Sequence, residues 1–130
     1  MYRISKEFHF CAAHQLHGLS ANHPCSRLHG HNYVVTFTFE AAELNKHGFV
    51  VDYRDLEYIK LFIDDTFDHK NLNDFHAFSI EKNSEAKNPT AENLAEVLFR
   101  LFDYSQPDAM LVSVEVKETP KTSAIFWGNV

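Results

Sequence analysis

The chain has few of the residues that mark secreted or membrane-bound proteins. Among its 130 residues are two cysteines, four glycines, four prolines and one tryptophan. Cys11 and Cys25 could form one disulfide at most, and in a chain without a secretion signal a thiol is more often catalytic, metal-bound or inert. No run of about 18 apolar residues is present to span a membrane, and the first residues lack the apolar core of a signal peptide. We therefore expect a soluble, cytoplasmic protein with no membrane partner.

Clusters of basic residues are also missing. Lysine and arginine number 12 against 18 aspartates and glutamates, which gives a formal net charge of −6. Without a basic patch we expect no nucleic-acid partner. What the chain does have is 45% hydrophobic residues and 14% aromatics, including twelve phenylalanines. This composition, with a length near the commonest domain size, predicts one folded domain over residues 1–130.

Two strands are predicted in the first third of the chain. Residues 4–14 alternate between apolar and polar side chains, and the apolar face is formed by Ile4, Phe8, Phe10 and Ala12. A loop at residues 18–26 contains glycine, proline, asparagine and serine. A second strand, rich in β-branched and aromatic residues, is predicted for residues 29–41.

Two helices follow the strands. Asp52 can cap the first, predicted over residues 52–67 from apolar positions at helical spacing, namely Leu56, Ile59, Ile63 and Phe67. Thr90 can cap the second, whose apolar stripe comprises Leu94, Val97, Leu98 and Leu101. Between the helices, residues 71–89 are predicted to be polar and irregular, with a mobile surface loop at 81–85.

Strands at residues 110–118 and 122–127, joined by a turn at Thr119 and Pro120, complete the order β-β-α-α-β-β. This order predicts an α+β domain in which a four-stranded antiparallel sheet carries both helices on one face. The edge strands of such a sheet are rich in valine and phenylalanine and need a partner. We therefore expect a homo-oligomer.

The strongest chemical signal is a pair of histidines separated by one glycine. His29 and His31 lie two apart in a strand, so their imidazoles point to the same side, and Gly30 leaves space between them. His14 ends the apolar face of the adjacent strand. Three neutral imidazoles with one open position are the pattern of catalytic zinc, so we predict Zn²⁺ at His14, His29 and His31. The alternative is that these side chains only bind backbone groups.

Two further groups could carry proton chemistry. Cys25 precedes His29 by four residues and could complete a closed, structural zinc shell; alternatively it lies outside the shell, where a nearby cation favours a thiolate that acts as base or nucleophile. Asp68 directly precedes His69, and a carboxylate that orients an imidazole fixes its tautomer for proton transfer. The alternative is an ordinary surface Asp-His dipeptide.

Glu118 continues the apolar face that alternation predicts for residues 110–118, whereas Glu115 and Lys117 lie on the polar face. A carboxylate at the end of an apolar stripe is costly unless it accepts hydrogen bonds. An aminopyrimidinone edge offers two adjacent donors, so Glu118 is a candidate for binding such a ring. The alternative is that the strand has ended and Glu118 is solvated.

Taken together, these residues resemble the 6-pyruvoyl-tetrahydropterin synthase and 6-carboxy-tetrahydropterin synthase superfamily. The similarity extends over nearly the whole chain, and its motifs are Phe10-x-Ala12-Ala13-His14, Cys25-x-x-x-His29-Gly30-His31, Val51-Asp52-Tyr53, Asp68-His69 with Leu72-Asn73, Pro89-Thr90-x-Glu92-Asn93 and Val116-Lys117-Glu118-Thr119. The resemblance implies the tunnelling fold, in which the sheets of three subunits join into a barrel and two trimers often stack.

The resemblance also implies roles for individual residues at sites between subunits. The three histidines would bind zinc, Cys25 would act as base, and the Asp68–His69 pair would transfer protons. Glu118 would anchor the pterin, and the backbone near Thr90 and Ala91 would help to hold the ring.

The spacer between Cys25 and His29 indicates the branch. Its three residues are similar to the carboxy-forming branch of queuosine and deazapurine biosynthesis, which converts 7,8-dihydroneopterin triphosphate to 6-carboxy-tetrahydropterin and releases acetaldehyde and triphosphate. Asn32-Tyr33 is also seen in the pyruvoyl-forming branch, so 6-pyruvoyl-tetrahydropterin synthase is the first alternative. A non-catalytic zinc-binding scaffold is the second.

Overall fold

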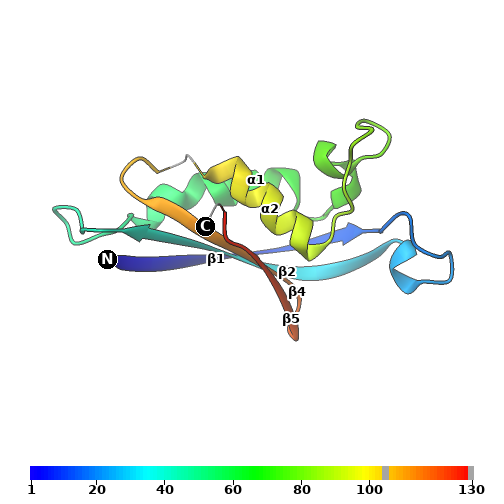
Figure 1. The fold of residues 1–130 in the computed structure, drawn as a ribbon, viewed down its shortest axis with the longest axis horizontal. Helices are drawn as coiled ribbons and strands as arrows, with labels where there is room; N and C mark the ends of the chain where they lie inside the picture. The colour runs from blue at the N-terminus through cyan, green and yellow to red at the C-terminus, as the bar shows by residue number, and fades with distance from the viewer. Residues whose placement is uncertain (104–105, 129–130) are drawn as a thin grey trace.

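Four strands form the body of a twisted sheet in the computed structural model, which describes residues 1–103 and 106–128. They are β1 (Tyr2–His14), β2 (His29–Ala41), β4 (Met110–Thr119) and β5 (Thr122–Phe126). In the order β1-β2-β4-β5, each of these four strands pairs antiparallel with the next (Figure 1). The predicted hairpins are confirmed, and the bounds of β2 match. The prediction starts β1 two residues late and ends β5 one residue late.

The sheet contains a fifth strand that the sequence pattern does not predict. The strand β3 (Lys70–Asn71) pairs parallel with β1, and the sheet order is β3-β1-β2-β4-β5. The predicted four-stranded, wholly antiparallel sheet is therefore wrong in strand number and in direction. A two-residue strand is too short to show alternation, so periodicity could not reveal it.

Both helices lie on the same side of the sheet, as predicted (Figure 1). The helix α1 (Glu57–Thr66) follows a 3-10 turn, η2 (Tyr53–Leu56), and the Asp52 carboxylate accepts a hydrogen bond from Arg54 N at 3.0 Å. Asp52 therefore caps the 3-10 turn rather than the α-helix itself. The helix α2 (Ala91–Phe102) begins after Thr90, the predicted cap.

The segment between the helices is more structured than predicted. Two 3-10 turns, η3 (Leu72–Asp74) and η4 (His76–Phe78), bury Leu72 and Phe78 completely. The expectation of a wholly polar, irregular segment is therefore wrong at these two positions. Residues 81–85 do lie mainly on the surface, as predicted.

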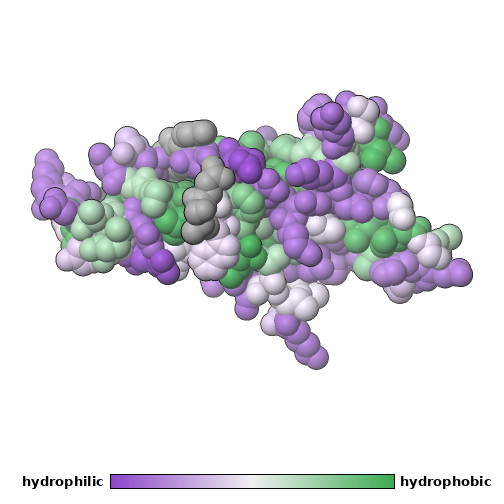
Figure 2. All heavy atoms as spheres, viewed as in Figure 1, coloured by the Kyte–Doolittle hydropathy of each residue, from purple (hydrophilic) through white to green (hydrophobic). Residues whose placement is uncertain are grey.

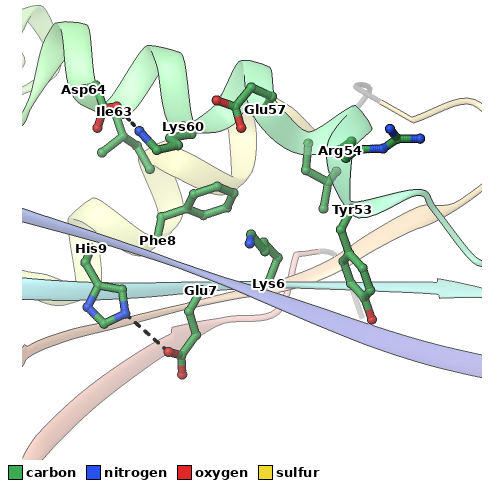
Figure 3. Close-up of a pocket in the computed structure, with 11 residues that line it drawn as sticks. Lys6, Glu7, Phe8, His9, Tyr53, Arg54, Glu57, Lys60, Ile63 and Asp64 are labelled. Atoms are coloured by element: carbon green, nitrogen blue, oxygen red, sulfur yellow. Dashed lines mark hydrogen bonds and ion pairs between the residues drawn. The ribbon is translucent and has the colours of Figure 1, made fainter.

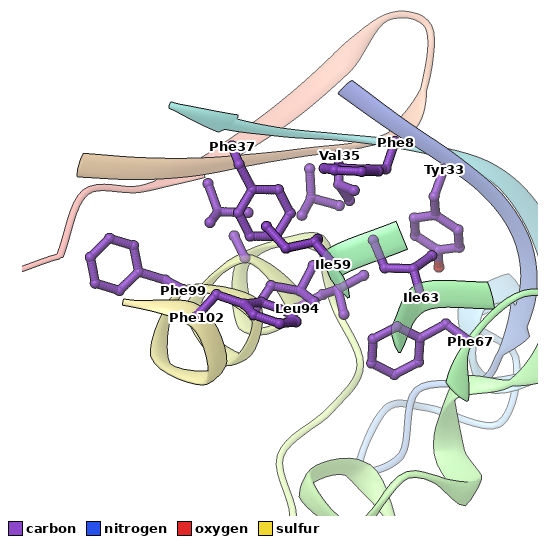
Figure 4. Packing of buried hydrophobic residues seen from close by; sticks show 14 of the residues in the cluster. Phe8, Tyr33, Val35, Phe37, Ile59, Ile63, Phe67, Leu94, Phe99 and Phe102 are labelled. Carbon is purple, nitrogen blue, oxygen red and sulfur yellow. The ribbon is translucent and has the colours of Figure 1, made fainter. Parts of the chain in front are cut away.

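The hydrophobic core fills the space between the sheet and the helices (Figure 4). From the sheet it takes Phe8, Tyr33, Val35 and Phe37, and from the helices Ile59, Ile63, Leu94, Phe99 and Phe102. Leu98 is buried as predicted, but Leu101 is 45% exposed, so its assignment to the buried stripe is wrong. Phe102, one residue further along α2, is buried in its place.

A β-bulge changes which residues of β4 face the core. The register with β2 shifts between Thr38 and Phe39, so that Phe39 pairs with Leu111 while Thr38 pairs with Ser113. Simple alternation predicts Met110 and Val112 on the buried face. Instead Leu111 is 4% exposed and Met110 is 59% exposed. One extra residue in a strand exchanges the two faces on one side of the bulge.

This bulge predicts unequal effects of two neighbouring substitutions on stability. Leu111→Ala should lower the free energy of unfolding by about 2–4 kcal/mol, because it leaves a cavity in the core. Met110→Ala should change it by less than about 0.5 kcal/mol, because that side chain is exposed. Urea unfolding of both variants at one protein concentration tests this. Equal effects would contradict the observed register.

Hydrophilic side chains dominate the face seen in Figure 2, with smaller hydrophobic patches between them. In residues 1–103 and 106–128, neither α1 nor α2 has the length and apolar character of a helix that crosses a bilayer.

Candidate metal centre and active site

Three histidines meet where β1 ends and β2 begins. His14 is the last residue of β1, His29 is the first of β2, and the two pair directly. His31 lies two residues along β2 and points to the same face of the sheet. In the part of the chain that the structure describes, the possible ligand atoms of these three residues all lie within 4.8 Å of one another. We call this group the histidine triad.

Backbone carbonyls fix two of the imidazoles. His14 Nδ1 lies 2.7 Å from the Pro89 carbonyl oxygen, and His29 Nδ1 lies 2.7 Å from that of Arg27. Because a carbonyl oxygen only accepts, each Nδ1 carries the proton, and each neutral ring keeps its lone pair on Nε2. The two Nε2 atoms are 3.0 Å apart. Two lone pairs at this distance repel unless a cation lies between them.

His14 is held in the form that a metal requires. It is 2% exposed, and this burial lowers its pKa. The hydrogen bond to Pro89 raises the pKa, and the other two imidazoles lower it again, so that the net shift is downward. A lowered pKa keeps the ring neutral at neutral pH, and only the neutral ring binds metal.

Glu118 lies beside the triad on the face predicted for it. Its Oε2 atom is 4.0 Å from His14 Nε2 and 3.9 Å from His31 Nε2. That oxygen is buried, and it has no hydrogen-bond partner among the described residues. An unpaired buried carboxylate oxygen is unfavourable, so this atom is available to a cation or to a donor on a bound ligand.

The donor set fits zinc. Three imidazole nitrogens with backbone-fixed rings, and an open side next to a carboxylate, match the ligands and outer hydrogen bonds of a catalytic zinc site. Within the described residues, Cys25 does not belong to the triad's group of possible ligand atoms. The geometry thus favours an open site over a closed Cys-His shell.

Cys25 lies in a 3-10 turn, η1 (Pro24–Ser26), within the loop that connects β1 to β2. Cys25 is half-buried. Its N–H donates to His23 Nδ1 at 3.0 Å, and its carbonyl oxygen accepts from Leu16 N at 2.8 Å. A backbone hydrogen bond therefore ties the Cys25 turn to Leu16, two residues after the end of β1.

The Asp68–His69 pair is formed as predicted. Asp68 Oδ2 lies 3.0 Å from His69 Nδ1, and Asp68 Oδ1 accepts from Cys11 N at 3.0 Å. The Cys11 amide, followed by His69, holds the pKa of Asp68 below its usual range. The ionised carboxylate favours the proton on Nδ1, which leaves His69 Nε2 to accept or release a proton. The His69 side chain is 80% exposed.

His69 also has an unusual backbone. Its φ is +60°, in the left-handed region that non-glycine residues rarely adopt. The residue lies between the end of α1 and β3, and its N–H donates to the Cys11 carbonyl at 2.6 Å. Backbone strain of this kind is concentrated at functional sites, where the surrounding structure must hold it.

Cys25 and the Asp68–His69 pair are anchored at different points along the same extended chain. The pair bonds to Cys11 and Cys25 bonds to Leu16, five residues further on. The strand β1 ends at His14, so a fully extended path from Cys11 to Leu16 gives at most roughly 16 Å between the two anchor points. Cys25 and the Asp68–His69 pair are thus held at two separate points of the backbone.

Two hollows adjoin His31. One, of about 560 Å³, is lined in part by Cys11, Asn32 and His69. The other, of about 460 Å³, is lined in part by Asn32, Lys117 and Glu118. Thr90 and Ala91 begin α2 next to Pro89, whose carbonyl contacts His14. Glu118, Thr90 and Ala91, for which substrate binding is predicted, thus lie near the histidine triad.

A third hollow, of about 430 Å³, lies between β1 and α1, away from the triad (Figure 3). Charged side chains of both signs line it, and some of them pair, Lys60 with Asp64 and His9 with Glu7. The hollow therefore has no single sign of charge, and we assign it no function.

Three groups that support the histidines were not among the predicted site residues. Pro89 and Arg27 act through carbonyl oxygens, which every residue has. Tyr33, whose hydroxyl oxygen lies 3.3 Å from His14 Nδ1, could have been found, because alternation along β2 places it on the same face as His31. Burial raises the pKa of Tyr33, so the hydroxyl stays neutral.

Comparison with known proteins gives a consistent family. The family profile described as 6-pyruvoyl tetrahydropterin synthase matches residues 3–129. The chain is 31% identical to the 6-carboxy-5,6,7,8-tetrahydropterin synthase of Bacillus subtilis over 129 residues, covering 96% of this chain and 84% of the relative. A protein of the same name from Rickettsia bellii is 30% identical over 92% of this chain and 96% of its own.

Solved structures agree with this result. The 6-pyruvoyl tetrahydropterin synthase of Caenorhabditis elegans superposes with a TM-score of 0.80 at 29% identity, covering 98% of this chain and 96% of that one. An uncharacterized protein from Wolinella succinogenes gives a TM-score of 0.81 at 27% identity, with 98% of each chain covered. The predicted tunnelling-fold architecture of the single chain is confirmed, and the chain belongs to the 6-pyruvoyl tetrahydropterin synthase family of pterin enzymes.

Proposed function

We propose that the protein is a zinc-dependent 6-carboxy-5,6,7,8-tetrahydropterin synthase. It would convert 7,8-dihydroneopterin triphosphate to 6-carboxy-tetrahydropterin with release of acetaldehyde and triphosphate, as part of queuosine or deazapurine biosynthesis. The observation that carries the metal dependence is the pair of Nε2 lone pairs 3.0 Å apart on His14 and His29. The product assignment is supported by the three-residue spacer after Cys25 and by the names of the Bacillus and Rickettsia relatives.

The residues around the metal centre have complementary tasks in this proposal. Glu118 accepts hydrogen bonds from the pterin ring N–H and amino group, and the backbone at Thr90 and Ala91 supports the ring. Zinc, when bound by the histidine triad, supplies a Lewis acid to the side-chain oxygens of the substrate. Cys25 removes the proton from the adjoining carbon.

The Asp68–His69 pair completes the proposed mechanism from another subunit. His69, oriented by Asp68, moves protons during loss of triphosphate and cleavage of the carbon–carbon bond. Because Cys25 and this pair are anchored at separate points of one chain, the proposed site takes Cys25 from one chain and the pair from its neighbour. This supports a homo-oligomer, either a trimer or a dimer of trimers.

Product analysis tests the proposed function. The zinc-loaded protein would be incubated anaerobically with 7,8-dihydroneopterin triphosphate, with mass analysis of the pterin and an acetaldehyde assay. We expect 6-carboxy-tetrahydropterin, acetaldehyde and triphosphate. Triphosphate without acetaldehyde would establish the pyruvoyl-forming alternative, and an unchanged substrate would favour the non-catalytic scaffold.

Asp68→Asn should lower turnover by about 10²-fold, because it reverses the His69 tautomer. An amide has one acceptor oxygen, which the Cys11 N–H occupies, so the NH₂ group then faces His69 Nδ1. The proton moves to Nε2, the atom that should accept one. Steady-state kinetics measures the loss. Asp65→Asn, at an exposed carboxylate of α1, is the matched control, and an equal loss in both variants would contradict the role of the pair.

A further inference from the structure

Two asparagine side chains hold the chain beyond β1 where no strand pairs with it. Asn73 Oδ1 accepts from Gln15 N at 2.9 Å, and its Nδ2 donates to the Gln15 carbonyl at 3.0 Å. Asn88 binds His17 in the same way: its Oδ1 accepts from His17 N at 2.8 Å, and its Nδ2 donates to the His17 carbonyl at 2.9 Å. Each carboxamide thus offers the donor and the acceptor that a neighbouring strand would supply.

The other edge of this segment holds Cys25. In an extended chain, the backbone groups of alternate residues point to opposite edges. Gln15 and His17 point toward the asparagines, and Leu16 donates its N–H to the Cys25 carbonyl at 2.8 Å. Leu16 is therefore fixed through both of its neighbours, and its position sets that of the Cys25 backbone.

The two asparagines are themselves anchored to the site. Asn73 N donates to Asn71 Oδ1 at 2.9 Å, and Asn71 belongs to β3, which follows the Asp68–His69 pair. The Asn88 carbonyl accepts from Asn93 Nδ2 of α2 at 2.9 Å, and the next residue, Pro89, contacts His14. We call each asparagine side chain, with its two hydrogen bonds to the backbone of Gln15 or His17, a clamp. The Asn73 clamp joins the Cys25 loop to β3, and the Asn88 clamp joins it to the histidine triad.

We propose that Asn73 and Asn88 are positioning residues that place the Cys25 thiol for turnover. The catalytic role of Cys25 in this proposal rests on the proposed function. The hydrogen bonds from Asn73 and Asn88 to the backbone do not depend on that function. Asn73 holds Gln15 and Asn88 holds His17, and both thereby fix Leu16, which bonds to Cys25. Neither asparagine acts on the substrate in this proposal. Loss of either clamp should leave the substrate bound and displace the base.

Asn88→Ala and Asn73→Ala, tested separately in the zinc-loaded protein, examine this role. We expect kcat to fall by about 10-fold to 10²-fold while KM changes by less than about threefold, because a shift of about 1 Å in a reacting group has effects of this size. Deuterium exchange in the peptide that contains Leu16 should be faster by at least about 10-fold. The rate at which iodoacetamide alkylates Cys25 should change relative to the rate at which it alkylates Cys11, which serves as the internal reference.

Asn83→Ala is the matched control. Asn83 also uses its carboxamide to accept one backbone N–H, that of Glu85, and to donate to one carbonyl, that of His76, but it does not bond to residues 15–17. It should leave all three measurements unchanged. Because Asn73 and Asn88 hold different residues, either variant tests the proposal if the other fails to fold.

Unchanged Leu16 exchange and unchanged relative alkylation of Cys25 in both clamp variants would overturn the proposal, whatever happens to turnover. A fall in kcat that Asn83→Ala matches would also overturn it, since the effect would then be general loss of stability. A wild-type protein without turnover would contradict the proposed function alone, because exchange and alkylation would still decide whether the clamp positions Cys25.

Discussion

The His31→Ala protein should bind no zinc at stoichiometric levels and should lose turnover by at least about 10³-fold. Removing one of three imidazoles leaves two nitrogen ligands, which hold a divalent ion far more weakly. His31 is the suitable target because its side chain is 19% exposed, so that its loss disturbs packing less than the loss of His14, whose side chain is 3% exposed. Turnover and metal should therefore disappear together in a protein that still folds.

Metal analysis after dialysis, together with turnover in excess zinc, provides the measurement. His9→Ala is the matched control, because His9 also lies on a long strand but its exposed side chain points away from the triad and contacts Glu7. The control should retain about one zinc per chain and full activity. A His31→Ala protein with one zinc per chain would show that the triad is not the metal centre.

The sequence was sufficient to find the triad because two periodic features coincide. Residues two apart in a strand share a face, and this rule alone brings His29 and His31 together. Alternation in the first strand then places His14 on the same side, and the hairpin register puts it directly opposite His29. Glu118 was found by the same reasoning, because the bulge against β2 lies before Val114, so that Val114 and Val116 are buried as alternation predicts; a second register shift, against β5, lies between Val116 and Thr119.

The groups that escaped prediction act over long sequence separations. Asn88 bonds to His17, 71 residues earlier, and Asn73 bonds to Gln15, 58 residues earlier. One sequence contains no signal that pairs an asparagine with a particular backbone amide so far away. The strand β3 is missed for a related reason, since its pairing depends on where α1 ends rather than on its own two residues. Local pattern thus predicts ligands better than it predicts the contacts that support them.

Strain and support occur together at the Asp68–His69 pair. His69 has a positive φ, and its backbone N–H and the Asp68 carboxylate both bond to Cys11. The buried Phe67, directly before the pair, stacks on Phe10 with ring centroids 5.9 Å apart. The core therefore fixes the start of the turn, and β1 fixes its end. An adjacent Asp and His on an unconstrained surface loop would have no such restraints.

Cys25→Ala should leave zinc bound and the fold intact but lower turnover by at least about 10³-fold. The thiol is the proposed base, and within the described residues it lies outside the group of possible zinc ligands. Cys11→Ala is the comparison: this second thiol donates to Asn32 Oδ1 at 2.9 Å and lines the hollow beside His69, but the backbone N–H that bonds to Asp68 is kept, so turnover should fall far less than in Cys25→Ala. Steady-state kinetics and metal analysis of both variants make the comparison. Turnover unchanged in Cys25→Ala would exclude the thiol as base.

Mixing two inactive proteins extends this test to the assembly. A Cys25→Ala chain retains the Asp68–His69 pair, and a His69→Ala chain retains Cys25, so a site built from two chains can be complete when the two variants are refolded together. In randomly mixed oligomers, about one site in four should then combine an intact Cys25 with an intact His69 from the neighbour. Recovery of about a quarter of wild-type turnover would therefore support a shared site. No recovery from a mixture proven to contain both chains would mean that each chain supplies Cys25 and His69 to the same site.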